Sequence, residues 1–200
     1  MIRIGKRNSR PLVGVLVILV AGAVVGVLSA FTAAADPAAT SSANAEACPE
    51  ADTPATEGTA REVRKWVRCR INEERAVHGV HKVTLNNSLR EAATRHAKVM
   101  VETRCLAHKC PGDPNLDTRI RRSGYPRGAD SWEYAEDTGC GVSADAMIGN
   151  WLAIKFHRIN ILNETFDDVG VGVVREPVKG RCDKDFATFA VVFGHREPSG

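Results

Sequence analysis

An apolar leader followed by six cysteines is the feature that most constrains what this chain of 200 residues can fold into. The leader begins with four basic residues, continues as an apolar run over residues 12–31 and ends in alanines at 33–35. This order of basic, apolar and small residues is typical of an export signal. We expect residues 1–35 to be a signal peptide that is cleaved near Ala35; the alternative is an uncleaved leader that anchors the chain in a membrane. Either way, we expect the remainder to be secreted.

The cysteines all lie after the leader, and their number indicates three disulfides. An even count in an exported chain favours disulfides because oxidising compartments preserve them, and no C-x-x-C pair suggests a zinc ribbon instead. Six cysteines allow fifteen pairings, so the sequence leaves the pairing open. Our working choice, which is a guess among the fifteen, joins Cys48 to Cys69, Cys105 to Cys110, and Cys140 to Cys182.

The charge balance gives no electrostatic reason to expect a nucleic-acid partner. The formal net charge is +3, but the four basic residues of the leader are not matched by any acid before Asp36. Removing those four positive charges leaves a net charge of −1 on the rest. Nucleic-acid binding needs clustered Lys and Arg, which a nearly neutral domain does not supply.

Two further regions follow the leader. Residues 36–57 are rich in Ala, Thr, Ser and Pro and have few large apolar side chains, so they are predicted to be a disordered linker. Residues 58–197 are predicted to form one domain, which we expect to be a monomer that meets a membrane only through an uncleaved leader.

Hydrophobic periodicity within the domain changes from helical to extended along the chain. Apolar residues at helical spacing predict helices over 59–77, from 87 to Met100, over 115–123 and over 143–156. Residues 169–175 and 186–193 are rich in β-branched and aromatic side chains and are predicted to be strands. Helices first and strands last favour an α+β fold. His96 lies on the apolar face of the second helix, where we expect a hydrogen-bonded core histidine rather than a ligand.

Several motifs, taken in order, resemble those of a known family. They are INEER at 71–75, LNNSL at 85–89, Ala92 with His96, Ala97 and Met100, RIRRSGY at 119–125, WLAIKFHRINIL at 151–162, DVGVGVV at 168–174 and ATFAVVFG at 187–194. This series resembles the CAP superfamily, also called SCP/PR-1-like, over roughly residues 58–194. In the motif at 151–162, Lys155 and its neighbours replace the Ser-Pro of the bacterial-type pattern.

The resemblance implies a fold and a cleft. The fold is a three-layer α-β-α sandwich with a central antiparallel sheet. The cleft is lined by two histidines, which carry over to His108 and His157, and by up to two acids. The first acid carries over to Glu136, where only the glutamate and the last glycine of the family's "ENIA-x-G" match, and Glu133 is a competing alignment. The second acid has no match within 152–156, so a complete set of four is not expected.

These cleft residues suggest two kinds of role. Two imidazoles and a carboxylate, here His108, His157 and Glu136, could hold zinc or another divalent cation. The alternative is that they hydrogen-bond to one another and fasten the loops over the sheet. Cys105 and Cys110 could hold His108 in place through a short disulfide.

No G-x-S-x-G or H-E-x-x-H motif is present, so an enzyme is the less favoured class. We expect a secreted binding module for a lipid, a sterol or a cell-surface partner. The alternatives are a metal-dependent hydrolase that uses the same cleft, and a structural module associated with the cell wall.

Overall fold

The computed structural model describes residues 3–6 and 48–200. The predicted cleavage point and the apolar run at 12–31 lie outside these described residues. Within the described part, none of the helices combines the length and the apolar character that crossing a membrane requires.

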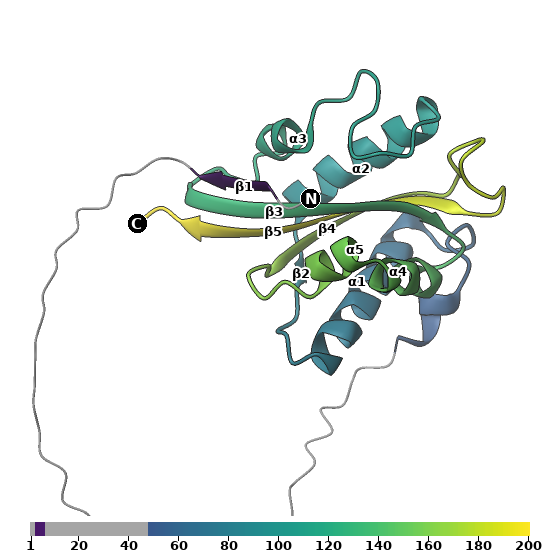
Figure 1. Cartoon of the computed structure of the whole chain (residues 1–200), viewed down its shortest axis with the longest axis horizontal. Coiled ribbons are helices and arrows are strands. Elements are labelled where there is room, and N and C mark those ends of the chain that lie inside the picture. Colours follow the sequence, from purple (N-terminus) through teal and green to yellow (C-terminus); the bar gives the residue numbers. More distant parts are fainter. Residues whose placement is uncertain (1–2, 7–47) are drawn as a thin grey trace, which may run out of the picture. The chain divides into compact units, whose positions relative to one another are not determined.

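Two helices cover one face of the sheet (Figure 1). They are α2 (Asn87–Glu102) and α3 (Leu116–Arg122). Each begins where an asparagine side chain accepts hydrogen bonds from backbone N–H groups of the first turn: Asn86 caps α2 and Asn115 caps α3. The caps explain why both helices begin within a residue or two of the predicted positions.

Three helices cover the opposite face (Figure 1). The first of them is α1 (Ala60–Val77). The Thr59 hydroxyl accepts from the backbone N–H of Glu62, whose carboxylate accepts from the N–H of Thr59 at 2.8 Å, so a capping box starts α1. The helix predicted over 143–156 is instead two helices, α4 (Ala144–Ala153) and α5 (Lys155–Ile161). Ile154 separates them because its backbone is extended, with φ −102° and ψ 119°.

The sheet has five strands in the order β1-β3-β5-β4-β2. Their bounds are β1 (Arg3–Lys6), β2 (Thr84–Leu85), β3 (Ala129–Gly141), β4 (Asp168–Val174) and β5 (Ala187–Pro198). The three long strands are antiparallel, as expected for the central sheet, whereas the short β2 pairs parallel with β4, so the sheet is mixed. The predicted strands correspond to β4 and β5, and β3 was not predicted.

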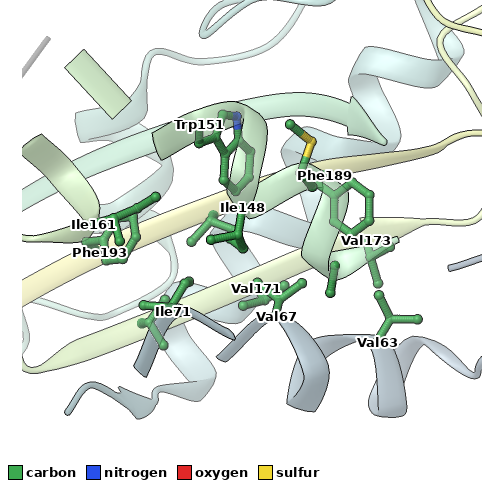
Figure 2. Close-up of a cluster of buried hydrophobic side chains, with 14 of the residues drawn as sticks. Val63, Val67, Ile71, Ile148, Trp151, Ile161, Val171, Val173, Phe189 and Phe193 are labelled. Carbon is green, nitrogen blue, oxygen red and sulfur yellow. The ribbon is translucent and has the colours of Figure 1, made fainter. Parts of the chain in front are cut away.

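The sheet and its two helical layers enclose two buried apolar clusters, one on each face. The first lies between the sheet and α1 and α4, and the second lies between the sheet and α2. Figure 2 shows the first cluster, in which Val63, Val67 and Ile71, four residues apart on α1, meet Val171 and Phe189 of the sheet. The predicted three-layer α-β-α sandwich is confirmed.

Glycine lets α2 lie directly against β4. A Cβ atom at Gly172 would lie 2.3 Å from the backbone carbonyl carbon of Ala93, and one at Gly170 would lie 2.1 Å from that of Leu89. Such distances are far shorter than any non-bonded contact, so the two alternate glycines of β4 set the spacing between helix and sheet.

Polar side chains of α1 fasten the loops at one end of the sheet. Asn72 exchanges two hydrogen bonds with the backbone of Val83, at 3.0 and 2.8 Å. Arg75 is fully buried and donates to four backbone carbonyls. These belong to His81, Ile161, Asn163 and Phe166. The motif INEER therefore has a structural role, because it satisfies carbonyl groups that no helix or strand pairs.

Three disulfides are formed, and they match the working choice: Cys48–Cys69, Cys105–Cys110 and Cys140–Cys182. The first joins α1 to a segment that was predicted to be linker. For residues 48–57 that prediction is wrong, since they include the 3-10 helix η1 (Pro49–Asp52) and bury Ala51 and Ala55. Both alanines belong to the apolar cluster between the sheet and α1 and α4. Residues 36–47 lie outside the described residues.

Candidate functional site

Glu136 is the centre of a buried polar cluster on the α2 side of the sheet. It lies opposite Val192 on β5, which belongs to the apolar cluster beneath α2, so its side chain is on that face. Arg119 of α3 binds both carboxylate oxygens, at 2.6 and 3.1 Å, and the Nδ1 atom of His108 lies 3.1 Å from Oε1. The side chains of Glu136 and Arg119 are 1% and 3% exposed, whereas that of His108 is 51% exposed. The site therefore has a solvent-facing imidazole above a buried ion pair.

Arg119 and His96 hold the loop that carries His108. Arg119 also donates to the carbonyl oxygens of His108 at 2.8 Å and Pro114 at 3.2 Å. His96 has Nδ1 at 2.5 Å from Asp113 and Nε2 at 2.9 Å from the carbonyl of Ala107. His96 is thus a hydrogen-bonded core histidine, as predicted. The Cys105–Cys110 disulfide closes the same loop, with Cys110 buried in the apolar cluster beneath α2.

The pKa of Glu136 follows from two opposed effects. Burial raises the pKa, but the hydrogen bonds from His108 and Arg119 outweigh it and leave the pKa below its usual value. Glu136 is therefore ionised at neutral pH and matches the charge of Arg119. Of the two alignments left open by the sequence, Glu136 rather than Glu133 is the one whose carboxylate meets His108.

His157 lies in a second cluster, on the opposite face of the sheet. Its Nδ1 atom is 2.7 Å from Oδ1 of Asp137, and the side-chain amide of Asn160 donates to the same oxygen at 2.7 Å. Asp137 lies opposite Val191, which belongs to the apolar cluster beneath α1 and α4. Since adjacent residues of a strand point to opposite faces, Glu136 and Asp137 direct their side chains away from each other.

Asp137 differs from its neighbour in its electrostatic environment. The side chain is fully buried, and its Oδ2 atom has no hydrogen-bond partner among the described residues. Burial raises the pKa of Asp137, and the hydrogen bonds from His157 and Asn160 only partly offset that effect, so the pKa stays above its usual value. The two carboxyl groups therefore have pKa values that are shifted in opposite directions.

The predicted metal ligands do not form one site. His108 meets Glu136, whereas His157 meets Asp137 on the other face. Within residues 3–6 and 48–200, no group of three or more His, Cys, Asp or Glu side chains is placed to hold a metal ion. Both oxygens of Glu136 already accept from the Arg119 guanidinium, whose positive charge opposes a cation at the same carboxylate. The residues present do not fit a divalent metal bound by His108, Glu136 and His157.

Three functional residues of these clusters were missed at the sequence level: Arg119, Asp137 and Asn160. The sequence showed Arg119 and Asn160 only as members of family motifs, and no interaction partner was predicted for either residue. Asp137 follows Glu136 directly and was counted as a mismatch. A strand prediction over 129–141 would have placed Asp137 on the face opposite Glu136, beside the histidine-bearing helix.

A groove lies between α2 and α3, next to the Glu136 cluster, and has a volume of about 330 Å³. It is lined by apolar atoms of Ala92, Val99 and Pro114 and by the exposed basic side chains of Lys98 and Arg122. Asp113 and Arg119 form part of its wall. The groove thus combines an apolar floor with a basic rim. A second hollow, of about 390 Å³, lies past the C-terminal end of α3, near Trp132, and its lining includes no residue of the Glu136 cluster.

Comparison with known proteins identifies the family. Residues 70–193 match the model of CAP, the cysteine-rich secretory protein family. An outer surface protein from Borrelia burgdorferi has a similar structure, with a TM-score of 0.58 and 20% identity over 70% of this chain and 97% of that one. So does an extracellular protein containing an SCP domain from Bacillus anthracis, with a TM-score of 0.54 and 21% identity over 69% of this chain and 44% of that one. A search of curated proteins gave no match. Because the family model covers more than half of the chain, the protein belongs to the CAP, or cysteine-rich secretory protein, family.

Proposed function

We propose that the protein is a secreted binding module whose α2–α3 groove takes a small amphiphile with an anionic headgroup. The observation that carries this proposal is the pairing of an apolar floor, made by Ala92, Val99 and Pro114, with the cationic rim of Lys98 and Arg122. An alkyl chain would lie along the floor, and a carboxylate or phosphate would meet the rim. A volume of about 330 Å³ is within the range of small-molecule sites.

The charges of the rim favour an anionic ligand over a sterol. Arg95, also at the groove, is paired with Glu91 four residues earlier, and Arg119 is bound to Glu136. Among the exposed cations of the lining, Lys98 and Arg122 are the two that form no ion pair with a described residue, and Glu102 is the exposed acid. Two such cations against one acid leave the rim with excess positive charge, which an anionic headgroup would neutralise and a sterol hydroxyl would not.

The buried clusters would act as the rigid wall of this groove. Asp113 and Arg119 line it, and each is held by hydrogen bonds to a buried partner, His96 and Glu136. Side chains that are fixed before binding lose little conformational entropy when a ligand arrives. The cluster around Glu136 thereby supports binding without taking part in a reaction.

Secretion is the second element of the proposal. The leader has the order of an export signal, and three disulfides are typical of a protein in an oxidising compartment. Membership of the cysteine-rich secretory family agrees with this location.

The metal-dependent hydrolase is not favoured as an alternative. Its three ligands are divided between two faces of the sheet, and the carboxylate is occupied by Arg119. A metal-bound water would need those groups to converge on one ion.

Titration of laurate into the purified protein tests the proposed function. We expect the double variant Lys98→Glu/Arg122→Glu to bind laurate at least about tenfold more weakly, since two favourable charges become two unfavourable ones. Lys65→Glu, an exposed lysine on α1, is the matched control and should bind as the wild type does. Dodecanol, which has the same chain without the charge, should bind weakly to all three proteins. Absence of laurate binding to the wild type, or equal binding by the groove variant, would rule out this site.

A further inference from the structure

The junction between α4 and α5 exposes large apolar side chains on the face of the sheet opposite the groove. Ile154 is 49% exposed, Phe156 is 68% exposed and Ile159 is 41% exposed. Phe156 and Ile159 are three residues apart on α5, so they are neighbours on one side of that helix. We call these three residues the α5 apolar patch.

Local folding does not account for the patch. Ile154 occupies the position that caps α5, yet it makes no side-chain capping hydrogen bond. Serine, threonine, asparagine or aspartate would stabilise this helix start. An isoleucine here supplies no cap and leaves about half of its side chain exposed.

The surroundings of the patch are positively charged. Lys155 and Arg158 are exposed on the same short helix, and the chain contains no Asp or Glu from 146 to 163. Arg158 donates to the carbonyl of Leu152 at 3.3 Å, which holds its guanidinium beside the helix junction. Asp137, the buried acid beneath α5, is paired with His157 and faces the interior.

The size of the patch separates two kinds of partner. Three partly exposed side chains offer on the order of 300 Å² of apolar surface. A stable protein interface buries roughly 800 Å² on each partner, so the patch alone is much smaller than such an interface. Insertion into the headgroup region of a bilayer needs only a few apolar side chains flanked by cations that meet anionic lipids.

We propose that the α5 apolar patch, together with Lys155 and Arg158, docks the protein onto the surface of an anionic lipid bilayer. Phe156 and the two isoleucines enter the boundary between headgroups and acyl chains, and the two cations pair with lipid phosphates. This contact is independent of the α2–α3 groove. It is also independent of the leader, which was the only membrane contact that the sequence suggested.

Co-sedimentation with vesicles tests the proposal. Both apolar clusters and all three disulfides lie within residues 48–200, so the chain from residue 36 onward is used, which lacks the apolar leader and the short edge strand β1. We expect binding to vesicles of phosphatidylcholine with about 30% phosphatidylglycerol and little binding to phosphatidylcholine alone. Phe156→Ser should lower the partition coefficient about tenfold, and Lys155→Glu/Arg158→Glu should abolish the preference for anionic vesicles.

Val77 supplies the matched control. It is 69% exposed, much as Phe156 is, but lies at the end of α1. Val77→Ser should bind vesicles as the wild type does. The proposal is overturned if the wild type does not sediment with anionic vesicles, or if Phe156→Ser binds equally well. It is also overturned if light scattering shows a wild-type dimer that Phe156→Ser converts to a monomer without any vesicle binding, because the patch would then be an interface between copies of the chain.

Discussion

Replacing Glu136 by glutamine tests whether the buried cluster is a structural clamp. The substitution keeps the shape of the side chain but leaves the Arg119 guanidinium, 3% exposed, without its counter-charge. Removal of one partner from a buried ion pair typically costs about 3–5 kcal/mol. Asp113 lies 3.4 Å from Nε of Arg119 and supplies part of the missing charge. We therefore expect Glu136→Gln to lower the free energy of unfolding by about 3 kcal/mol at neutral pH.

Urea denaturation of four proteins measures this effect: wild type, Glu136→Gln, Arg119→Met and the double variant. Since each single change strands the other charge, the double variant should be less destabilised than the sum of the two, with a coupling of about 2 kcal/mol. Strictly additive effects, or a cost for Glu136→Gln below about 1 kcal/mol, would refute the clamp.

Asp137 provides the matched control, because its pKa is shifted in the opposite direction. The lowered pKa of Glu136 means that its contribution to stability is present above its unfolded value of 4.5 and is lost as the pH falls through the folded value. The raised pKa of Asp137 means that its charged form is disfavoured in the folded state, so its contribution is lost as the pH rises above 3.8. Asp137→Asn should therefore cost less than Glu136→Gln at neutral pH, and the difference between the two variants should shrink below pH 4.5.

Three further predictions concern the scaffold, and thermal or urea unfolding checks each. Arg75→Met should cost about 4 kcal/mol, because four backbone carbonyls lose the buried guanidinium that donates to them; a cost similar to that of an exposed arginine would contradict this. Gly172→Ala should cost about 3 kcal/mol or more, because its Cβ would overlap the backbone of Ala93, and unchanged stability would mean that α2 can move away from the sheet. Replacing Cys140 and Cys182, 42 residues apart, by serine should cost about 4 kcal/mol, and a negligible loss would show that the reduced chain is already constrained there.

The elements that the sequence predicted well are those with a strong apolar period. The stripe of Val63, Val67 and Ile71 predicts α1 because burial on one helical face requires that spacing, and the capping box at Thr59 fixes its start. The β-branched residues of β4 and β5 predict strands because these strands are central and almost wholly buried. The break at Ile154 was missed because one extended residue changes no period, and the packing of α5 beneath β3 becomes visible only in the structure.

The strand β3 was missed for a different reason, which also explains the errors at the site. Its buried positions include Glu136 and Asp137, so its pattern does not resemble that of a core strand. These carboxyl groups are tolerated because Arg119, His108, His157 and Asn160 approach from α3, a loop and α5, which are far away in the sequence. Partners so distant in the sequence leave no local pattern around the carboxyl groups that they bind. The family motif indicated the position of Glu136 but not that Arg119 is its partner.

The second acid of the cleft was sought on α4 because the resemblance placed it there, and 152–156 contain none. The two histidines reach the sheet from opposite sides, His108 from the loop after α2 and His157 from α5. A strand between them presents one residue to each side, so two adjacent carboxyl groups on β3 can serve both imidazoles. Each histidine then has its own acid. If one residue were inserted into or deleted from β3 before Glu136, the two carboxyl groups would exchange faces of the sheet. The histidine–acid pairs would survive only if the register between β3 and β5 shifted by the same residue. The arrangement therefore depends on the alternation of β3, and a metal ion shared by both histidines would need their acids on one side of the strand.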